Sequence, residues 1–313
     1  MYKSIKSISL GVMGAALLSL PVTAQTVGLG TTKGGATAQI ANAIASVVSD
    51  AGIIQMRPAV SANTSQYIPL VNAGRLEFGI ANYPQTFYAV QGTGMSSEPN
   101  PDLRVVATLF PFKPGILTPK STGIKSYSDL KGYKVPRFPD KSLGDFVIRA
   151  ALSAGGLGYE DIQEVPIANF PRMFDAVKQG QTDISIAATG SKPTYDIQAA
   201  VGDITFIPFA ATDEAKVAKI LPGATIVEIA ANADLPGLGD GTSVIAYDYL
   251  LFAHKDVSDE AVTAVLTALA EGQEALKSTS PLWREYDPSG LGKASDLEYH
   301  PAAVTFHKSQ SGG

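Results

Sequence analysis

The sequence predicts an α/β fold made of two similar lobes. Two segments that begin 106 positions apart, Val71–Ala81 and Val177–Ala187, share valine, glycine, an acidic residue, isoleucine and alanine in register. In each copy the glycine can take the left-handed backbone that ends a helix, and the short apolar run after the acidic residue is typical of a buried strand. Chance similarity is the alternative, because such joints recur in α/β proteins. The chain repeats a β-α-β order around both copies, and its 313 residues suffice for two domains.

The first lobe opens with a strand, a glycine-rich turn and a helix, which is how α/β units begin. Cap-forming side chains at 61–65 then favour a helix that ends at Asn72. In order, we expect a strand at 27–31, the turn at 33–37, a helix at 38–49, a strand at 56–60, the helix ending at Asn72, the first template strand and a strand at 105–109.

The segment 110–115 is expected to cross into a second lobe, because it is rich in proline, aromatic residues and glycine. There Ser126 with Asp129 forms a capping box, and Gly132 ends the short helix that it starts. The second lobe should continue with a strand from Lys134 to Arg137, a helix at 142–154, a strand near 164–167, a helix at 171–179 and the second template strand.

A strand at 205–209 then returns the chain, followed by a helix at 211–221, a long apolar strand at 243–253 and a helix at 258–277. The proline- and serine-rich tail is expected either to form a short final helix or to wrap the first lobe. The predicted organisation is a signal segment at 1–24, a first lobe of 25–110 plus 211–313, and a second lobe of 111–210.

The N-terminus predicts export. Lys3 and Lys6 precede an apolar run and a Val22-Thr23-Ala24 site, which is the pattern of a secretory signal cleaved after Ala24. Its loss takes the formal net charge from −5 to −7, which disfavours nucleic acid and acidic membranes as partners. The absence of cysteine excludes disulfides, thiol catalysis and a lipid-modified cysteine. We therefore expect a periplasmic protein.

The glycine-rich turn is the first candidate binding element. Gly28 and Gly30 resemble a dinucleotide fingerprint, but Lys33 stands where a third glycine is needed, so a cofactor site is not predicted. Backbone N–H groups at 33–37 and the following helix dipole suit a carboxylate or another small anion. A plain turn with a solvated Lys33 is the alternative.

Arg137 and Tyr83 are candidates because each stands at a predicted strand end. A planar guanidinium there suits bidentate binding of a carboxylate. An ion pair with Asp140 or a solvent-facing arginine is the alternative. Tyr83 follows Asn82 at the end of the first template strand and is expected to line the gap between the lobes, while Phe87 is better explained by core packing.

Catalytic motifs are weak. Ser128 and Lys131 match a serine–lysine nucleophile pair, but its companion motifs are missing and helix capping explains both residues. His254, His300 and His307 lie late in the chain without metal-ligand spacing. We expect neither a metal nor a catalytic triad.

The chain resembles the TAXI-type solute-binding proteins, which are the extracytoplasmic receptors of a subset of TRAP transporters. The segments that carry this resemblance are the turn at 30–37, the stretch 70–81, the stretch 123–135 and the stretch 178–183. The resemblance implies a type II-like periplasmic binding fold with two Rossmann-like lobes and two hinge crossovers. It also implies a small carboxylate ligand, such as glutamate, a 2-oxoacid or a dicarboxylate.

The same resemblance, together with the strand ends, implies ligand contacts at these residues: Thr32, Lys33, Gly34, Gly35, Ala36, Thr37, Asn63, Asn82, Tyr83, Arg137, Ser142, Leu143, Thr189, Gly190 and Ser191. The loop 137–142 departs from the Gly-Pro-Ser-rich loop of many relatives, which puts the ligand in question. The expected partner is a TRAP-type membrane permease, and the receptor is expected to be a monomer. The alternatives are an ABC-importer receptor for an aromatic or sulfonate-like ligand, a secreted serine hydrolase, and presentation of the ligand to a sensory kinase.

Overall fold

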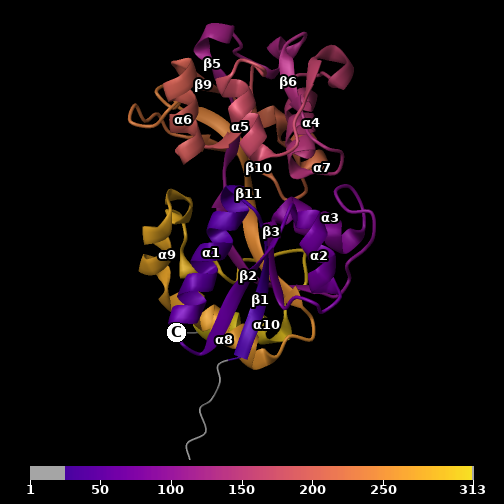
Figure 1. The fold of residues 1–313 in the computed structure, drawn as a ribbon, viewed down its shortest axis with the longest axis vertical. Helices are drawn as coiled ribbons and strands as arrows, with labels where there is room; N and C mark the ends of the chain where they lie inside the picture. The colour runs from indigo at the N-terminus through magenta and orange to yellow at the C-terminus, as the bar shows by residue number, and fades with distance from the viewer. Residues whose placement is uncertain (1–24, 312–313) are drawn as a thin grey trace, which may run out of the picture.

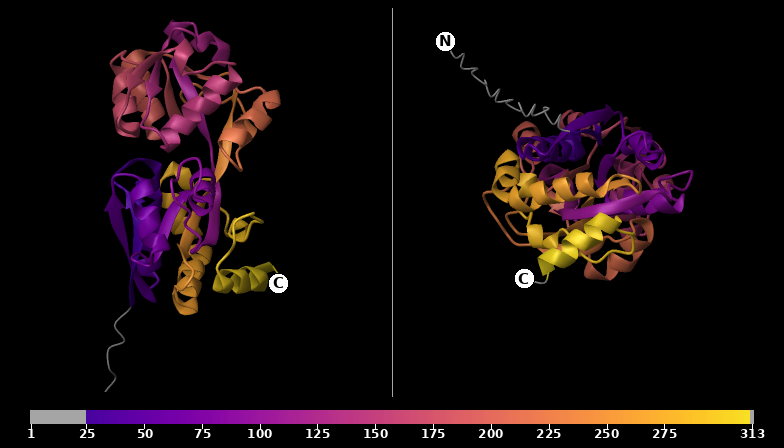
Figure 2. Two further views of the ribbon diagram at one scale, coloured as in Figure 1. Left: turned by 90° about the vertical axis from the view of Figure 1, so that its right-hand side faces the viewer. Right: turned by 90° about the horizontal axis from the view of Figure 1, so that it is seen from below.

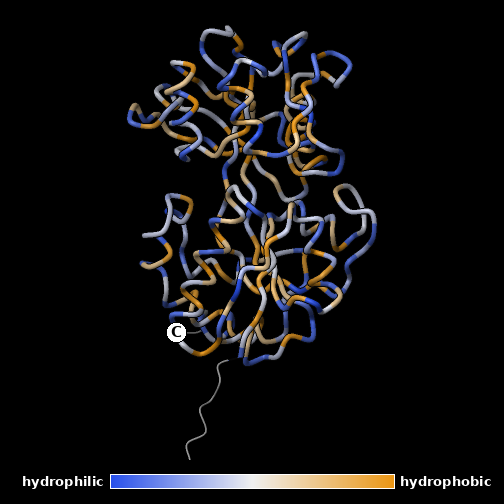
Figure 3. The backbone as a smooth tube through the Cα atoms, in the orientation of Figure 1, coloured by the Kyte–Doolittle hydropathy of each residue, from blue (hydrophilic) through white to orange (hydrophobic). Residues whose placement is uncertain are grey.

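The computed structural model describes residues 25–311, which form two lobes joined by extended crossover strands (Figure 1). The predicted signal segment and its cleavage site lie outside the described residues. Apolar segments run through the middle of both lobes (Figure 3). The two-lobed α/β prediction is therefore confirmed.

The first lobe is built on one mixed sheet in the order β2-β1-β3-β11-β4. Strands β1, β2 and β3 are parallel, and β11 runs antiparallel to both β3 and β4. The strands are β1 (Gln25–Thr32), β2 (Ile54–Ser61), β3 (Phe78–Asn82), β4 (Leu103–Phe112) and β11 (Thr242–His254).

Helices cover both faces of this sheet. On one face α1 and α8 share a hydrophobic core with the buried Trp283, and on the other face Tyr67 and Val71 of α2 pack against Phe252. Helix α10 lies beside α8 (Figure 2, right). The helices of this lobe are α1 (Gly35–Asp50), α2 (Thr64–Asn72), α3 (Tyr83–Gln91), α8 (Asp259–Glu271), α9 (Gln273–Thr279) and α10 (Pro301–Ser311).

The second lobe repeats the arrangement with shorter strands. Strand β5 runs antiparallel between β8 and β9, and β6 pairs in parallel with β7 and is joined to the start of β8 through Asp183. Its strands are β5 (Pro114–Pro119), β6 (Lys134–Arg137), β7 (Gln163–Pro166), β8 (Ser185–Ala188), β9 (Ile204–Ile207) and β10 (Thr225–Ile229). Its helices are α4 (Leu143–Ala154), α5 (Phe170–Lys178), α6 (Lys192–Val201) and α7 (Glu214–Ile220), with a short 3-10 helix at Tyr127–Leu130.

The two repeated segments, 71–81 and 177–187, form the same helix-glycine-strand unit in the two lobes. Gly74 and Gly180 follow α2 and α5 with φ of 65° and 67°, and each lets the chain turn into β3 or β8. Each of the two strands pairs with an antiparallel strand of its lobe, β3 with β11 and β8 with β5. The two lobes therefore use the same helix stop at the same place.

The crossover strands can be followed through their pairing. Residues 110–112, at the start of the predicted crossover segment, continue β4 because they pair with Tyr247 and its neighbours on β11, and β5 begins at Pro114. The return to the first lobe was predicted at 211. Val217 and Leu221 belong to the same hydrophobic cluster as Ile148 of α4, so we propose that the chain returns to the first lobe within β11, near Tyr247.

Other elements were missed or merged. Strands β5 and β10 and helix α6 were not predicted as such, and the expected helix at 258–277 is divided by Gly272, where a Cβ would collide with Val47 of α1. The tail does both things that the sequence allowed: it forms α10 and pairs with the first lobe where Tyr299 bridges Val105. Within residues 25–311, no helix has the length and apolar character to cross a membrane.

Candidate functional site

The topology brings many predicted site residues to the edges where the lobes meet. Strand β4 reaches the crossover at Phe112, and β3, which runs in the same direction, ends close by at Asn82. In the second lobe β8 pairs with the start of β5, so it ends at the crossover too. We call the strand ends and helix starts at these two edges the inter-lobe face. Parallel strands of α/β proteins bind ligands at such carboxyl ends.

The glycine-rich turn lies on the inter-lobe face, between β1 and α1. Helix α1 begins at Gly35, earlier than predicted, so residues 35–37 form its first turn. Gly34 stands at the N-cap, and no described side chain caps the helix there. A Cβ on Gly34 or Gly35 would meet nothing within 4 Å. The first N–H groups of α1, which have no intrahelical partner, are thus left open.

Hydroxyl groups surround this turn. Thr37 Oγ1 lies 3.0 Å from Tyr249 Oη, and Thr31 Oγ1 donates to the Thr37 carbonyl at 3.3 Å. Burial raises the pKa of Tyr249 to about 12, so its phenol remains protonated at neutral pH. Thr32 Oγ1 bonds the Gly34 carbonyl at 2.9 Å, while Lys33 is exposed. The turn is therefore polar, and its hydroxyl groups carry no charge.

A second uncapped helix start stands beside it. Asn63 occupies the N-cap of α2, but its Oδ1 accepts from Ser65 Oγ at 2.6 Å instead of capping the helix. Thr64 receives a hydrogen bond from Gln85 Nε2, and Gln85 Oε1 accepts from Asn82 Nδ2 at 2.7 Å. These hydrogen bonds connect the start of α2 with the start of α3.

Asn82 and Tyr83 lie at the end of β3 and the start of α3. Asn82 is fully buried and caps α3 by accepting from the Gln85 N–H at 3.1 Å, so its amide holds the fold together. The Tyr83 ring packs with Leu250 and Leu297 and lies against Gly223. Burial, with the nearby Asp296, raises its pKa. Tyr83 of the first lobe thus meets Gly223 of the second lobe, and its contact with a ligand stays a prediction.

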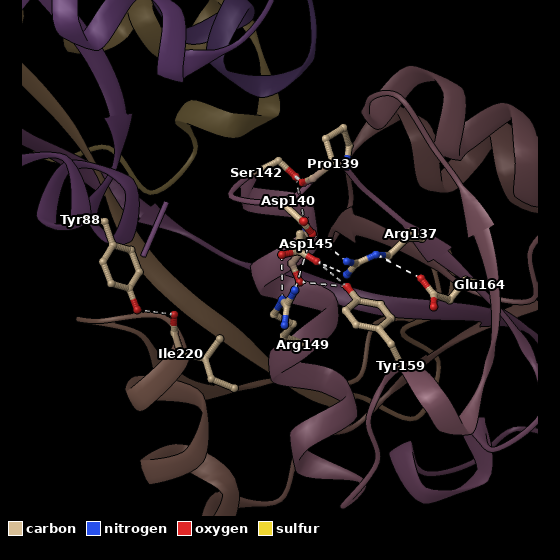
Figure 4. A network of polar contacts seen from close by, with 10 residues as sticks. All are labelled: Tyr88, Arg137, Pro139, Asp140, Ser142, Asp145, Arg149, Tyr159, Glu164 and Ile220. Atoms are coloured by element: carbon tan, nitrogen blue, oxygen red, sulfur yellow. Dashed lines mark hydrogen bonds and ion pairs between the residues drawn. The ribbon is translucent and has the colours of Figure 1, made fainter. Parts of the chain in front are cut away.

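Arg137 ends β6 on the second lobe's part of the inter-lobe face, where it is enclosed by acidic side chains (Figure 4). It pairs with Asp145 at 2.7 Å, with Asp140 at 2.7 Å and with Glu164 at 3.1 Å. Its guanidinium also stacks 3.9 Å from the centre of the Tyr159 ring. The alternative of an ion pair with Asp140 is the one observed, extended to two further carboxylates.

Asp145 is the centre of this network. Its side chain is 1% exposed, and it accepts from Arg149 at 2.8 Å and from the Tyr159 hydroxyl at 2.7 Å. Burial, followed by the hydrogen bond to Asp145, raises the pKa of Tyr159 far above its usual value, so the phenol stays a donor. The network thus contains two cationic side chains, three anionic side chains and the Tyr159 hydroxyl, which leaves Arg137 with no surplus charge for a ligand.

Of the other ligand contacts predicted in the second lobe, some already have partners within the chain and one does not. Ser142 caps α4 by accepting from the Asp145 N–H at 3.3 Å and also donates to the Pro139 carbonyl at 2.7 Å, while Leu143 packs against the core. Thr189 follows β8 at the crossover, where its N–H reaches the Lys113 carbonyl at 3.4 Å. Ser191 is the N-cap of α6, yet its buried hydroxyl has no partner among residues 25–311.

The alternative chemistries have little geometric support. Ser128 pairs with Ser126 at 2.9 Å, and Lys131 lies 3.6 Å from Asp161, so the two are engaged separately. Gly28 and Gly30 are strand residues whose missing side chains make room for Leu76 and Tyr67. His307 bonds the Val106 carbonyl inside the first lobe, and burial lowers its pKa. Within residues 25–311, no three acidic or histidine side chains gather as a metal site would require.

Some site residues were missed by the sequence analysis. Thr64, Gln85 and Tyr249 join the helix starts into one surface, but Tyr249 lies more than two hundred positions from Thr37. The cap-rich segment 61–65 carried a signal for Thr64. Tyr249 gave none, because its place depends on β11 lying between β3 and β4.

The chain matches known proteins over almost its full length. A protein-family model described as the NMT1-like family matches residues 28–310. The sulphonate-binding protein SsuA of Escherichia coli, described as periplasmic, has a TM-score of 0.51 and 15% identity, covering 91% of this chain and 79% of that chain.

Two further structures share the fold. A binding protein component of an ABC phosphonate transporter from Pseudomonas aeruginosa has a TM-score of 0.56 and 9% identity, covering 84% of this chain and 80% of that chain. PhnD1 of Prochlorococcus marinus, solved with methylphosphonate, has a TM-score of 0.56 and 10% identity, covering 92% of this chain and 98% of that chain. At these identities the likeness establishes the two-lobed binding-protein fold.

Proposed function

The chain belongs to the NMT1-like family, and on that premise we propose that it is an exported solute-binding receptor. It holds a small organic anion between its lobes and presents that anion to a membrane permease. Binding, with no bond made or broken, is the whole of its chemistry. The signal segment cleaved after Ala24 would deliver it to the periplasm.

One observation carries the proposal: helices α1, α2 and α6 begin on the inter-lobe face, and no described side chain caps their first turns. Two of them belong to the first lobe and one to the second. Uncapped first-turn N–H groups and the positive end of a helix dipole favour an anion. Within the described chain, the donors left open on α6 are the Lys192 N–H and the Ser191 hydroxyl, because Pro193 has no N–H and the Thr194 N–H bonds the Ser191 carbonyl. An anion between the lobes would satisfy donors from both lobes, which favours the closed arrangement of a hinged protein.

The charges of this face favour a ligand with a single negative charge. Arg137 is held by three carboxylates of the chain, and Lys192 pairs with Asp196 at 2.7 Å. Lys33 is the remaining cation of the proposed contact set, and it has no ion pair within residues 25–311. A carboxylate or a sulfonate fits this balance better than a doubly charged phosphonate.

Two permease classes are candidates. The TAXI resemblance implies a TRAP-type permease, whereas the structural neighbours include a binding component of an ABC phosphonate transporter and a sulphonate-binding protein. The neighbours favour the ABC class. Uptake of labelled ligand into cells that carry one permease or the other, with this receptor added, decides between them.

A thermal-shift screen on unfolded and refolded protein tests the ligand class. The probes are propionate, ethanesulfonate and ethylphosphonate, which share one alkyl group, followed by glutamate, 2-oxoglutarate and succinate. A ligand at about 100 times its dissociation constant stabilises the fold by about 2.7 kcal/mol. The proposal expects a raised Tm with a singly charged probe, and a panel without any shift contradicts it.

A matched pair of substitutions at Gly34 tests whether the anion binds at the start of α1. Gly34→Asp and Gly34→Asn both supply a good N-cap in open space, but only aspartate adds a negative charge to the anion site. We expect both variants to keep wild-type stability, and Gly34→Asp to bind the best probe at least about tenfold more weakly than Gly34→Asn, a difference of about 1.4 kcal/mol. Equal affinities, measured by calorimetry, would remove the start of α1 from the site.

A further inference from the structure

The segment that follows α3 belongs to the first lobe but packs on the second. Met95 is 6% exposed and is part of the hydrophobic cluster that contains Ile148 and Val217 of the second lobe. An apolar side chain buried in the core of the other lobe resists separation, because opening would return it to water. We call residues 92–98 the strap.

Tyr88, near the end of α3, contacts both the strap and the second lobe. Its hydroxyl donates to the Ile220 carbonyl at 3.0 Å, and its ring meets Phe146 edge-on with centroids 5.4 Å apart. Ile220 ends α7, so Tyr88 satisfies one of the carbonyls that the helix leaves without a partner. Gly94, with φ of 54°, passes so close to the Tyr88 ring that a Cβ there would collide with it. The Tyr88 ring therefore contacts both Gly94 of the strap and the end of α7 in the second lobe.

A polar contact closes the far end of the strap. Lys141 Nζ donates to Ser97 Oγ at 2.8 Å. Within residues 25–311, Lys141 is the one residue other than glycine with a positive φ, 65°. This left-handed backbone is sparsely allowed for lysine and persists only where neighbouring contacts impose it. Here those contacts are the Arg137–Asp140 pair and the hydrogen bond from Ser142 to the Pro139 carbonyl (Figure 4).

We propose that the strap is a fixed contact that holds the two lobes together on one flank, so that they open and close by pivoting on it and on the crossover strands. The strap and α7 lie on one flank, and α9 and α6 lie on the other (Figure 1). Arg137 acts here as a positioning residue, because through Asp140 it holds the loop that presents Lys141. The proposal concerns the protein without ligand and stands independently of the proposed function.

The chain has no cysteine, so two spin labels can be placed at will. Asn42→Cys on α1 and Ala199→Cys on α6 are both exposed and report the spacing of the lobes away from the strap. Distance distributions are measured by pulsed electron paramagnetic resonance on ligand-free protein. We compare the unmodified strap with the double variant Tyr88→Phe/Ser97→Ala, which removes both polar contacts, and with Met95→Ala, which removes the apolar anchor.

Tyr133→Phe is the matched control, because its hydroxyl donates to the Thr122 carbonyl at 3.0 Å entirely within the second lobe. The expected result is one narrow distance peak for the wild type and the control, and loss of that single peak in both strap variants. Circular dichroism verifies that each variant is folded. Wild-type distributions in both strap variants would overturn the proposal, and so would equal broadening in the control.

Discussion

Residues that follow neighbouring strands of this chain have different surroundings: some are open on the inter-lobe face, and others make contacts within the fold. The sequence alone does not distinguish them. Gly34 and Gly35 were predicted as an anion-binding turn, and they stand open on the inter-lobe face. Asn82 and Tyr83 were grouped with them because they also follow a strand. Within the chain, Asn82 caps α3 and the Tyr83 ring packs with Leu250 and against Gly223, while their contact with a ligand stays a prediction. Position along the strand was predictable, but the partners of each side chain were not.

Glycines inside β1 are required by packing. A Cβ on Gly30 would lie 2.6 Å from the Tyr67 ring, so we expect Gly30→Ala to lower the free energy of unfolding by about 1 to 3 kcal/mol through overpacking. Gly239→Ala is the control, since a Cβ there meets nothing within 4 Å and its φ is not positive. Urea denaturation measures both, and an unaffected Gly30→Ala would refute the packing argument.

Of the three carboxylates that hold Arg137, Asp145 and Asp140 should differ in how much they stabilise the fold. Asp145 is 1% exposed and joins two arginines and a tyrosine, so Asp145→Asn should cost about 3 kcal/mol of stability. Asp140, whose side chain is 74% exposed, is the matched control on the same guanidinium, and Asp140→Asn should cost less than about 1 kcal/mol. Chemical denaturation compares them, and similar losses would show that burial does not govern the network.

At the scale of elements, local signals worked where the chain marks its own ends. The capping box of Ser126, a helix beginning near Ser142 and the stops at Gly74 and Gly180 were all predicted. Strand β5 was missed because its run contains two prolines and a glycine. The position of Gly272, where α8 gives way to α9, matches a close approach to Val47 of α1, which lies far away in the sequence. Tertiary contacts decided these elements.

The duplicated helix stops should respond alike to substitution. Gly74→Ala and Gly180→Ala each force alanine into a left-handed backbone, and neither Cβ would meet an atom closer than 3.7 Å. We therefore expect each to lower stability by about 1 kcal/mol from backbone strain alone. Thermal unfolding of both variants checks this. Losses that differ severalfold would mean that the two joints are not equivalent.

For the whole molecule, two lobes followed from the repeated template and the chain length. The composition of 110–115 indicated a first crossover there, but no local signal marked a passage along β11, where Tyr247 and its neighbours pair with the end of β4. Whether residues face one another across the lobes depends on these strands, which explains why the lobe-spanning contacts of Met95 and Lys141 had no signal in the sequence.

Buried phenols set a whole-molecule pH dependence. Burial raises the pKa of Tyr67, Tyr127 and Tyr247, and raises that of Tyr249 to about 12. The unfolded chain loses these protons near pH 10, while the folded chain retains them. Stability contributed by these groups is therefore complete below about pH 10 and is lost as the pH rises through the folded pKa values. Urea unfolding between pH 8 and 11 should show this decline, and a flat profile would contradict it.

A crystal structure of the protein purified from its native compartment, with whatever ligand it carries, tests the central claim most directly. We expect one small anion between the lobes, with its charged group within hydrogen-bonding distance of the N–H groups of residues 35–37 and of the first turn of α6. A ligand bound instead on the outer flank of the second lobe, around Tyr195 and Leu235, would contradict the account.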